Sequence, residues 1–244
     1  LLMIKFFQWI YTLYSGLLFI LLMLIFGWFI VIPILFSDKG DRVSFFFIRL
    51  WAGIWSLLSG IRYEIEGLEH IDRSKPYIYI FNHRSFIDAP VIPIAIPQEL
   101  RALGKKELSK IPFFGWVVGK LAVWVDRSST ESRRASLEKL IQILEKGKSV
   151  VVAPEGTRND SHELLLPFQK GAFRLSIETG IPILPMAVLG ADRIMKRGSI
   201  LLSPGKVKIY FSKPILPPSP SEKAVNDFTA RCKNRLEAML VAHG

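Results

Sequence analysis

Hydrophobic residues are concentrated at the amino-terminal end of the chain. No charged residue occurs between Phe6 and Ser37, and Leu, Ile, Phe and Trp fill this segment. As a helix rising about 1.5 Å per residue, the segment is longer than the roughly 30 Å of a hydrocarbon layer requires. A secretory signal has an apolar stretch of only about 7 to 15 residues and a small-residue cleavage site. We therefore predict a helix that is retained and associated with a membrane.

A second apolar run extends from Val43 to about Gly60, after the polar break SDKGDR at Ser37 to Arg42. This pattern predicts two apolar helices joined by a tight turn, which together form a membrane hairpin over residues 1–60. Arg49 lies near the middle of the second helix. A charge there is costly in hydrocarbon unless its side chain snorkels or the helix lies at the interface. Two spans and a monotopic hairpin therefore both remain open.

From residue 61 onward, short β-rich runs alternate with helical stretches, punctuated by Gly and Pro. Apolar residues recur at helical spacing over 131–147, before the stop signal Gly147, and an amphipathic pattern predicts a last helix from Ser221 to about Ala242. The expected strands are Tyr77–Phe81, Ala122–Asp126, Val150–Ala153, Ile183–Leu189 and Val207–Phe211. We predict an α/β fold with a single domain over 61–244, in which helices flank a mixed central sheet.

The net charge of the chain narrows the classes of partner that it can bind. The formal net charge of +11 and the isoelectric point near 9.8 indicate anionic partners. Lys and Arg are scattered without a basic run or a nucleic-acid motif, so we expect an anionic membrane or a phosphorylated lipid and no nucleic acid.

Cys232 is the only cysteine, which excludes an intrachain disulfide. Lys5 and Arg62 make both outer flanks of the hairpin positive, so a spanning hairpin would place the domain in the cytoplasm.

The first candidate for chemistry is His83, in the segment NHRSFID directly after the apolar run PYIYIF. A loop that follows a strand of an α/β sheet is a common position for an active site. Asp88 follows five residues later, close enough for its carboxylate to hold one imidazole nitrogen while the other accepts a proton. The alternative is that Asp88 caps a helix and His83 is an ordinary turn residue.

The second candidate is VVVAPEGTRND, where another apolar run ends in Glu155, Gly156, Thr157 and Arg158. Glycine lets the backbone approach a ligand closely, and arginine can bind a phosphate through two parallel hydrogen bonds. A tight turn with a solvated arginine explains the same letters. Lys105, in LGKKELSKIPFFGW, offers a further positive charge beside an apolar patch that suits a hydrocarbon chain.

Other chemistries find little support in the sequence. It contains no nucleotide-binding G-x-x-x-x-G-K-[ST] motif and no G-x-S-x-G motif of a serine hydrolase. A metal site would need His83 and Asp88 together with His162, and no other residues have ligand spacing. We therefore expect no metal and no cofactor.

Together the four blocks NHRSFID, KKEL to PFFGW, APEGTRN and IPILPMAV resemble the glycerolipid acyltransferase family, in particular the lysophosphatidic acid (1-acyl-sn-glycerol-3-phosphate) acyltransferases. The resemblance covers about Pro76 to Leu189, and NHRSFID matches the family's H-x4-D motif. Two departures are visible, because Ala153 replaces the family's usual aromatic residue and Asn159 its usual serine.

The resemblance implies that His83 deprotonates the acceptor hydroxyl with support from Asp88. It further implies that Glu155 to Arg158 hold the glycerol phosphate, with Lys105 carried over from the intervening block. The expected reaction moves a fatty acyl group from acyl carrier protein or coenzyme A to the sn-2 hydroxyl of lysophosphatidic acid, giving phosphatidic acid at the cell inner membrane. Glycerol 3-phosphate, a lysophospholipid or a lyso-amino-lipid are alternative acceptors. The non-enzymatic alternative is a membrane-anchored protein that binds anionic lipid.

Overall fold

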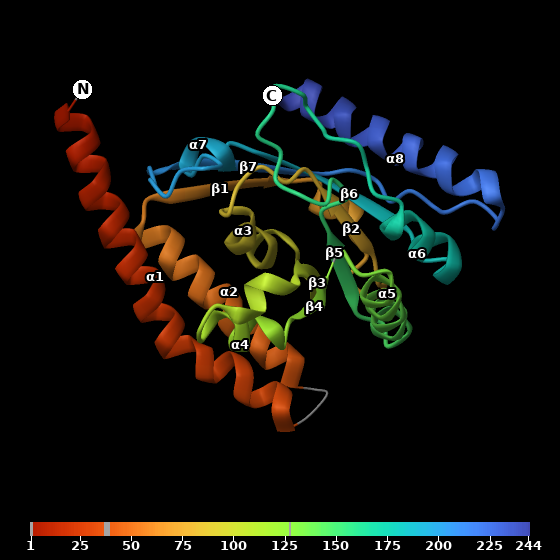
Figure 1. The fold of residues 1–244 in the computed structure, drawn as a ribbon, viewed down its shortest axis with the longest axis horizontal. Helices are drawn as coiled ribbons and strands as arrows, with labels where there is room; N and C mark the ends of the chain where they lie inside the picture. Colours follow the sequence, from red (N-terminus) through yellow and green to blue (C-terminus); the bar gives the residue numbers. More distant parts are fainter. Residues whose placement is uncertain (1, 37–39, 127) are drawn as a thin grey trace. The chain divides into compact units, whose positions relative to one another are not determined.

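A computed structural model describes residues 2–36, 40–126 and 128–244 (Figure 1). The predicted turn at Ser37 to Arg42 lies outside the described residues at positions 37–39. The chain divides into two compact units. The first comprises Leu1–Glu64, Arg84–Pro97 and Leu189–Ile209, and the second comprises Ile65–His83, Gln98–Val188 and Tyr210–Gly244. One of the places where the chain passes from one unit to the other is between His83 and Arg84.

The first unit contains α1 (Leu2–Phe36), α2 (Gly40–Leu58), α3 (Asp88–Ala95) and the short α7 (Ala191–Ile194). Both predicted amino-terminal helices are present, and they pack against each other. The Phe19 ring on α1 lies 5.0 Å from the Trp51 ring and 5.6 Å from the Trp55 ring of α2. The Trp55 indole N–H donates to the Ser15 carbonyl at 3.0 Å. Aromatic packing and a satisfied indole donor therefore hold the two helices together.

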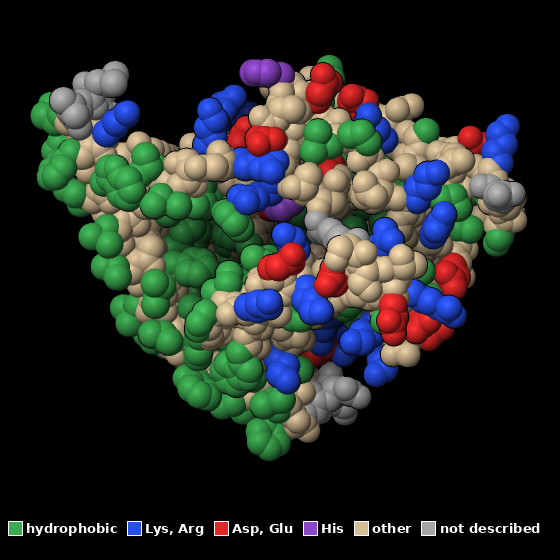
Figure 2. All heavy atoms as spheres, viewed as in Figure 1, with side chains coloured by type: hydrophobic (Ala, Val, Ile, Leu, Met, Phe, Trp, Pro, Cys, Tyr) green, Lys and Arg blue, Asp and Glu red, His purple; other side chains and the backbone are tan. Residues whose placement is uncertain are grey.

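Apolar side chains cover much of α1 (Figure 2). Within the described ranges, α1 is the one helix that is long and apolar enough to cross a membrane, over Lys5–Phe36, and only 28% of its most apolar window is buried. Exposed leucine, phenylalanine and tryptophan side chains follow one another along it, as expected of a helix that meets lipid. By contrast, α2 carries Asp41, Arg42 and Arg49.

The strands are β1 (Ile61–Glu66), β2 (Ile78–Phe81), β3 (Leu100–Lys105), β4 (Ala122–Val125), β5 (Ser149–Val152), β6 (Ile183–Leu189) and β7 (Gly205–Phe211). Of these, β2, β3, β4, β5 and β6 pair in parallel. Ile78 pairs with Val150 on one side of β2 and with Ile183 on the other, and β3 pairs with both β4 and β5. The hydrogen-bonded order is β1-β7-β6-β2-β5-β3-β4.

Helices α5 (Thr130–Glu145), α6 (Gly171–Thr179) and α8 (Glu222–His243) pack around one hydrophobic core with the strands of this unit (Figure 1). Ser129 and Ser221 cap α5 and α8 by accepting backbone N–H groups. The shorter elements are η1 (Leu68–His70), η2 (Lys106–Lys110) and α4 (Phe114–Gly119). The predicted α/β fold, with helices flanking a central sheet, is confirmed.

Candidate active site

The register of the parallel strands brings three predicted site residues to the same edge of the sheet. Ile80 of β2 pairs with Val152 of β5, and His83 and Glu155 each lie three positions beyond their paired residue. Val151 of β5 likewise pairs with Ala102 of β3, and Lys105 lies three positions beyond it. Loops at the carboxyl ends of parallel strands are where α/β proteins bind ligands. The sheet therefore places three separate motifs at one such edge.

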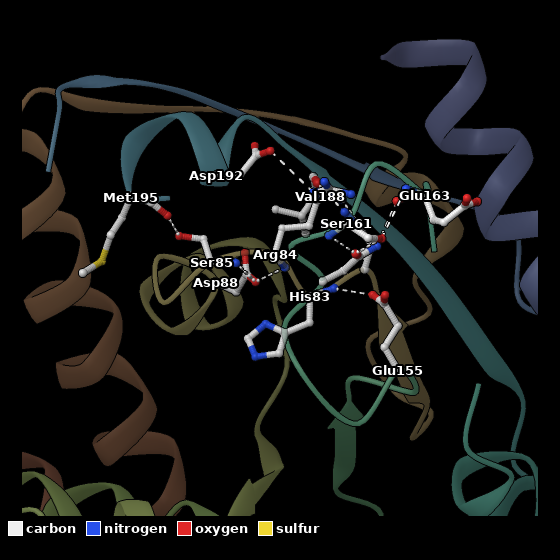
Figure 3. Close-up of polar contacts among 12 residues, drawn as sticks. His83, Arg84, Ser85, Asp88, Glu155, Ser161, Glu163, Val188, Asp192 and Met195 are labelled. Atoms are coloured by element: carbon white, nitrogen blue, oxygen red, sulfur yellow. Dashed lines mark hydrogen bonds and ion pairs between the residues drawn. The ribbon is translucent and has the colours of Figure 1, made fainter. Parts of the chain in front are cut away.

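The main chain of His83 is hydrogen-bonded on both sides by the loop that follows β5 (Figure 3). Its backbone N–H donates to Glu155 Oε1 at 2.8 Å, and its carbonyl accepts the Asn159 N–H at 2.7 Å. The imidazole ring also lies edge-on to the Phe81 ring, with centroids 5.6 Å apart. Because both peptide groups of His83 are engaged, its backbone position is fixed by a second motif as well as by its own loop.

Glu155 uses both carboxylate oxygens for the main chain. Oε1 accepts from His83, and Oε2 accepts the Leu166 N–H at 2.8 Å. The residue is only 4% exposed, so these charge-assisted bonds offset the cost of its burial. Glu155 thus joins the loop after β2 to the segment before α6. Its expected contact with glycerol phosphate stays a prediction.

The rest of this loop combines a tight turn with polar groups near the surface. Gly156 has φ +72°, a left-handed conformation that favours glycine, and its N–H donates to the Ala153 carbonyl at 3.1 Å. Thr157 is exposed and Arg158 is half-buried. Their expected contact with the acceptor phosphate also stays a prediction.

Asn159, one of the two departures from the family pattern, has a structural part in this loop. Its amide Nδ2 donates to the Glu163 carbonyl at 2.9 Å, and its Oδ1 accepts from the N–H and the hydroxyl of Ser161 at 2.9 and 2.7 Å (Figure 3). At 2% exposure the side chain is buried. Its main chain can therefore hold His83 in a well-defined place.

Asn82 was missed by sequence reasoning. This residue is 1% exposed, and its side chain donates to the Val188 carbonyl and accepts the Val188 N–H, both at 2.7 Å. The amide therefore joins the ends of β2 and β6 directly before His83. Its position between an apolar strand and a histidine is the one signal that the sequence offers, because the partner lies more than a hundred positions away.

In the first unit, Asp88 is the first residue of α3 and is 2% exposed. Its Oδ2 accepts the backbone N–H groups of Arg84 and Ser85, both at 3.1 Å (Figure 3). The Ser85 hydroxyl donates to the Met195 carbonyl at 2.7 Å, and Arg84 Nε lies 3.5 Å from Asp192 Oδ2. Asp88 therefore shapes the loop that leads away from His83, and residues after β6 brace that loop.

Lys105 ends β3 with a side chain that is 55% exposed, and its ammonium lies 3.2 Å from Glu107 Oε1. Its neighbour Lys106 lies 3.7 Å from Asp126 Oδ2. Ion pairs between exposed side chains contribute little to stability, because water and salt screen them. Lys105 therefore stands at the expected edge of the sheet with a charge that an anionic ligand can attract.

Other features of the described residues lie apart from these motifs. A cavity of about 550 Å³ is lined by residues of β1, η1, β7 and α8, none of which is a predicted site residue. Among the described residues, no three His, Cys, Asp or Glu side chains are placed to hold a metal ion. His162 is exposed. Burial raises the pKa of the Cys232 thiol to about 12, so this cysteine is kept protonated and inert.

Comparison with known proteins supports the motif assignment. Residues 62–189 match the family model described as Acyltransferase. A chloroplastic 1-acyl-sn-glycerol-3-phosphate acyltransferase from Brassica napus is 33% identical over 185 residues, covering 75% of this chain and 53% of the relative. The 1-acyl-sn-glycerol-3-phosphate acyltransferase of Saccharomyces cerevisiae is 29% identical over 191 residues, covering 77% of this chain and 63% of the relative. This chain therefore spans about half the length of the Brassica relative.

A solved structure covers nearly the whole chain. The crystal structure of the 1-acyl-sn-glycerophosphate acyltransferase from Thermotoga maritima superposes with a TM-score of 0.79 and 25% sequence identity, covering 96% of this chain and 97% of that one. The similarity thus includes the amino-terminal helices as well as the four blocks.

Proposed function

The chain belongs to the acyltransferase family, as its motifs indicated, and we propose that it transfers a fatty acyl group from an acyl thioester to the sn-2 hydroxyl of lysophosphatidic acid. The product is phosphatidic acid. The observation that carries this proposal is the double hydrogen bonding of the His83 main chain by Glu155 and Asn159. It links the proposed base to the proposed phosphate-binding loop, as a reaction on a phosphorylated alcohol requires.

His83 is the general base of the proposed reaction. It takes the hydroxyl proton as the acceptor oxygen attacks the thioester carbonyl, so that an O–C bond forms while the C–S bond breaks. The proton then leaves His83 with the thiolate. Asp88 supports the imidazole that becomes charged, a part suited to a buried carboxylate five residues away in the same short segment. A thioester is reactive enough that this route needs no covalent enzyme intermediate.

Positive and polar groups at the edge of the sheet recognise the acceptor. Arg158 binds the phosphate through its guanidinium, Gly156 and Thr157 supply close backbone and hydroxyl contacts, and Lys105 adds a point charge. Glu155 completes the loop. The chain's net charge of +11 favours anionic substrates, including lysophosphatidic acid and the acyl carrier protein or coenzyme A donor. No cofactor takes part in the proposed reaction.

The α1–α2 pair brings this site to its lipid substrate. A lysophospholipid spends most of its time in a bilayer, so an apolar anchor raises its effective concentration at the enzyme. The exposed apolar residues of α1 and the family membership support this assignment. We place the protein at the cell inner membrane with its site facing the cytoplasm.

Thiol release tests the proposal. Palmitoyl-coenzyme A and palmitoyl-acyl carrier protein are each incubated with the purified protein, with lysophosphatidic acid, with glycerol 3-phosphate or without an acceptor. Release that depends on lysophosphatidic acid and is lost in His83→Ala supports the proposal. Release with glycerol 3-phosphate alone would change the acceptor, release without any acceptor would indicate a thioesterase, and no release would favour a lipid-binding protein.

A further inference from the structure

Arg49 is the only charged residue of α2 beyond its first turn, and a charge in so apolar a helix needs polar partners. The structure supplies them within the first unit. Arg49 Nε donates to the Pro93 carbonyl at 3.0 Å, and Nη2 donates to the Ile96 carbonyl at 2.7 Å. The guanidinium also lies 5.9 Å from the centre of the Phe45 ring. Arg49 therefore binds the carboxyl-terminal end of α3 instead of only reaching for water.

The sequence of α3 explains why these carbonyls need a donor. The carbonyl of residue i in an α-helix normally accepts from residue i+4, and position 97, four residues after Pro93, is a proline without an N–H. The last carbonyls of any helix also carry partial negative charge, which favours a cation. The Ile92 carbonyl is satisfied by the Ile96 N–H at 3.0 Å. Arg49 satisfies the Pro93 and Ile96 carbonyls.

The opposite end of α3 begins with Asp88, whose carboxylate accepts the N–H groups of Arg84 and Ser85. Eight residues at about 1.5 Å each make a rod of roughly 12 Å between the two ends. A short helix fixed at one end holds its other end in place. Asp88 orders the loop that follows His83. The hydrogen bonds from Arg49 to the other end of α3 therefore also stabilise that loop.

We propose that Arg49 is a positioning residue for acyl transfer, which acts by holding α3 and through it Asp88. This inference rests on the function proposed above. It gives the amino-terminal helices a second task, since α2 then belongs to the scaffold of the active site as well as to the membrane anchor. If the helices served only as an anchor, the contacts of Arg49 would not affect catalysis in detergent.

The test compares Arg49→Met with Arg49→Lys and with the matched control Arg42→Met, each as the 244-residue chain in detergent. Arg42 is an exposed cation on the same helix, so its loss removes the same charge without the contacts to α3. We expect Arg49→Met to lower kcat by about 10- to 100-fold and to change the KM for lysophosphatidic acid by less than about threefold, since a displacement of about 1 Å costs on this order. Arg49→Lys retains intermediate activity because a lysine ammonium replaces only part of the hydrogen bonding of the guanidinium, whose Nε and Nη2 donate to two carbonyls. Arg42→Met stays within about twofold of wild type.

Two readouts separate positioning from a general loss of stability. In an Asp88→Asn background, Arg49→Met should cost less than about threefold more, because both changes act on the same group. Hydrogen exchange of the peptide covering residues 84–97 should quicken in Arg49→Met and not in Arg42→Met.

Wild-type kcat and unchanged exchange in Arg49→Met would overturn the inference, as would a full additional loss in the Asp88→Asn background. Absence of acyl transfer in the wild type would instead refute the proposed function. In that event the catalytic role of Arg49 falls with it, and the exchange experiment still decides whether Arg49 holds α3.

Discussion

Replacing Glu155 by glutamine changes one atom in the group that holds His83. The carboxylate accepts two backbone N–H groups, from His83 and Leu166, each at 2.8 Å. A glutamine amide has a single acceptor oxygen, so one of the two N–H groups must face an NH₂ group. The variant therefore loses one charge-assisted hydrogen bond in a site that is 4% exposed.

The loss of such a bond costs about 1.5 to 3 kcal/mol, which lowers the melting temperature of a protein of this size by roughly 3 to 12 °C. If the amide turns its oxygen toward Leu166, the His83 main chain is released. We then expect kcat to fall by about 10- to 100-fold, since a base that moves by about 1 Å loses catalysis on this order. If Glu155 acts only by holding the His83 main chain, the KM for lysophosphatidic acid changes little.

Steady-state thiol release at varied lysophosphatidic acid and thermal melts in detergent measure both effects. Glu178→Gln is the matched control, since Glu178 is an exposed glutamate on α6. A raised KM with unchanged kcat in Glu155→Gln would show instead that this carboxylate contacts the acceptor. Wild-type kcat together with a wild-type melting temperature would show that the Glu155 carboxylate does not hold the His83 main chain.

Four further predictions concern other parts of the molecule. Asn82→Ala leaves both peptide groups of Val188 without their buried partner, so urea unfolding should show a loss of about 2 to 4 kcal/mol, and a loss below 1 kcal/mol would contradict the assignment. Because burial raises the pKa of the Cys232 thiol to about 12, the native protein should not react with an aromatic disulfide reagent at pH 8, whereas the unfolded chain should consume one equivalent. The unfolded thiol ionises near its ordinary pKa of about 8.5, so above that pH the unfolded chain binds fewer protons than the native protein. The free energy of unfolding of the wild type should therefore fall as the pH rises from about 8.5 toward 12. In Cys232→Ala, which lacks the thiol, it should fall less steeply. Leu17 and Leu21 are 58% and 55% exposed on α1. The double variant Leu17→Arg, Leu21→Arg should move from the membrane pellet to the supernatant after a carbonate wash, because two charges are costly in hydrocarbon. Retention of this variant in the pellet would argue against insertion of α1.

Local patterns in the sequence predict most of the helices and strands. The five predicted strands agree with β2, β4, β5, β6 and β7 to within two residues, because each is a compact apolar run between turn residues. The helix over 131–147 was recognised from its period and stop signal and corresponds to α5. Two strands were missed. Of these, β1 has alternating polar residues, and β3 contains arginine, glycine and lysine in six positions.

The order of the strands in the sheet cannot be predicted from local sequence patterns. The predicted strand, helix and strand around α5 exist, but β3 lies between β4 and β5 in the sheet. Such pairing depends on contacts between residues far apart in the chain. The site shows the same limit, since the motifs identified His83 and Glu155 separately, whereas the hydrogen bond between them spans 72 positions. Arg49 was noticed as a charge in an apolar helix, and only the structure connects it to α3.

We propose that this chain acylates the sn-2 hydroxyl of lysophosphatidic acid with His83 as the base. The most direct measurement uses an isotope-labelled palmitoyl thioester and 1-oleoyl lysophosphatidic acid, followed by digestion of the product with a phospholipase that cleaves only at sn-2. We expect the wild type to form labelled phosphatidic acid from which the phospholipase releases labelled palmitate, and His83→Ala to form no labelled phosphatidic acid. Label retained in the lysophospholipid after digestion, or labelled phosphatidic acid formed equally by His83→Ala, would contradict it.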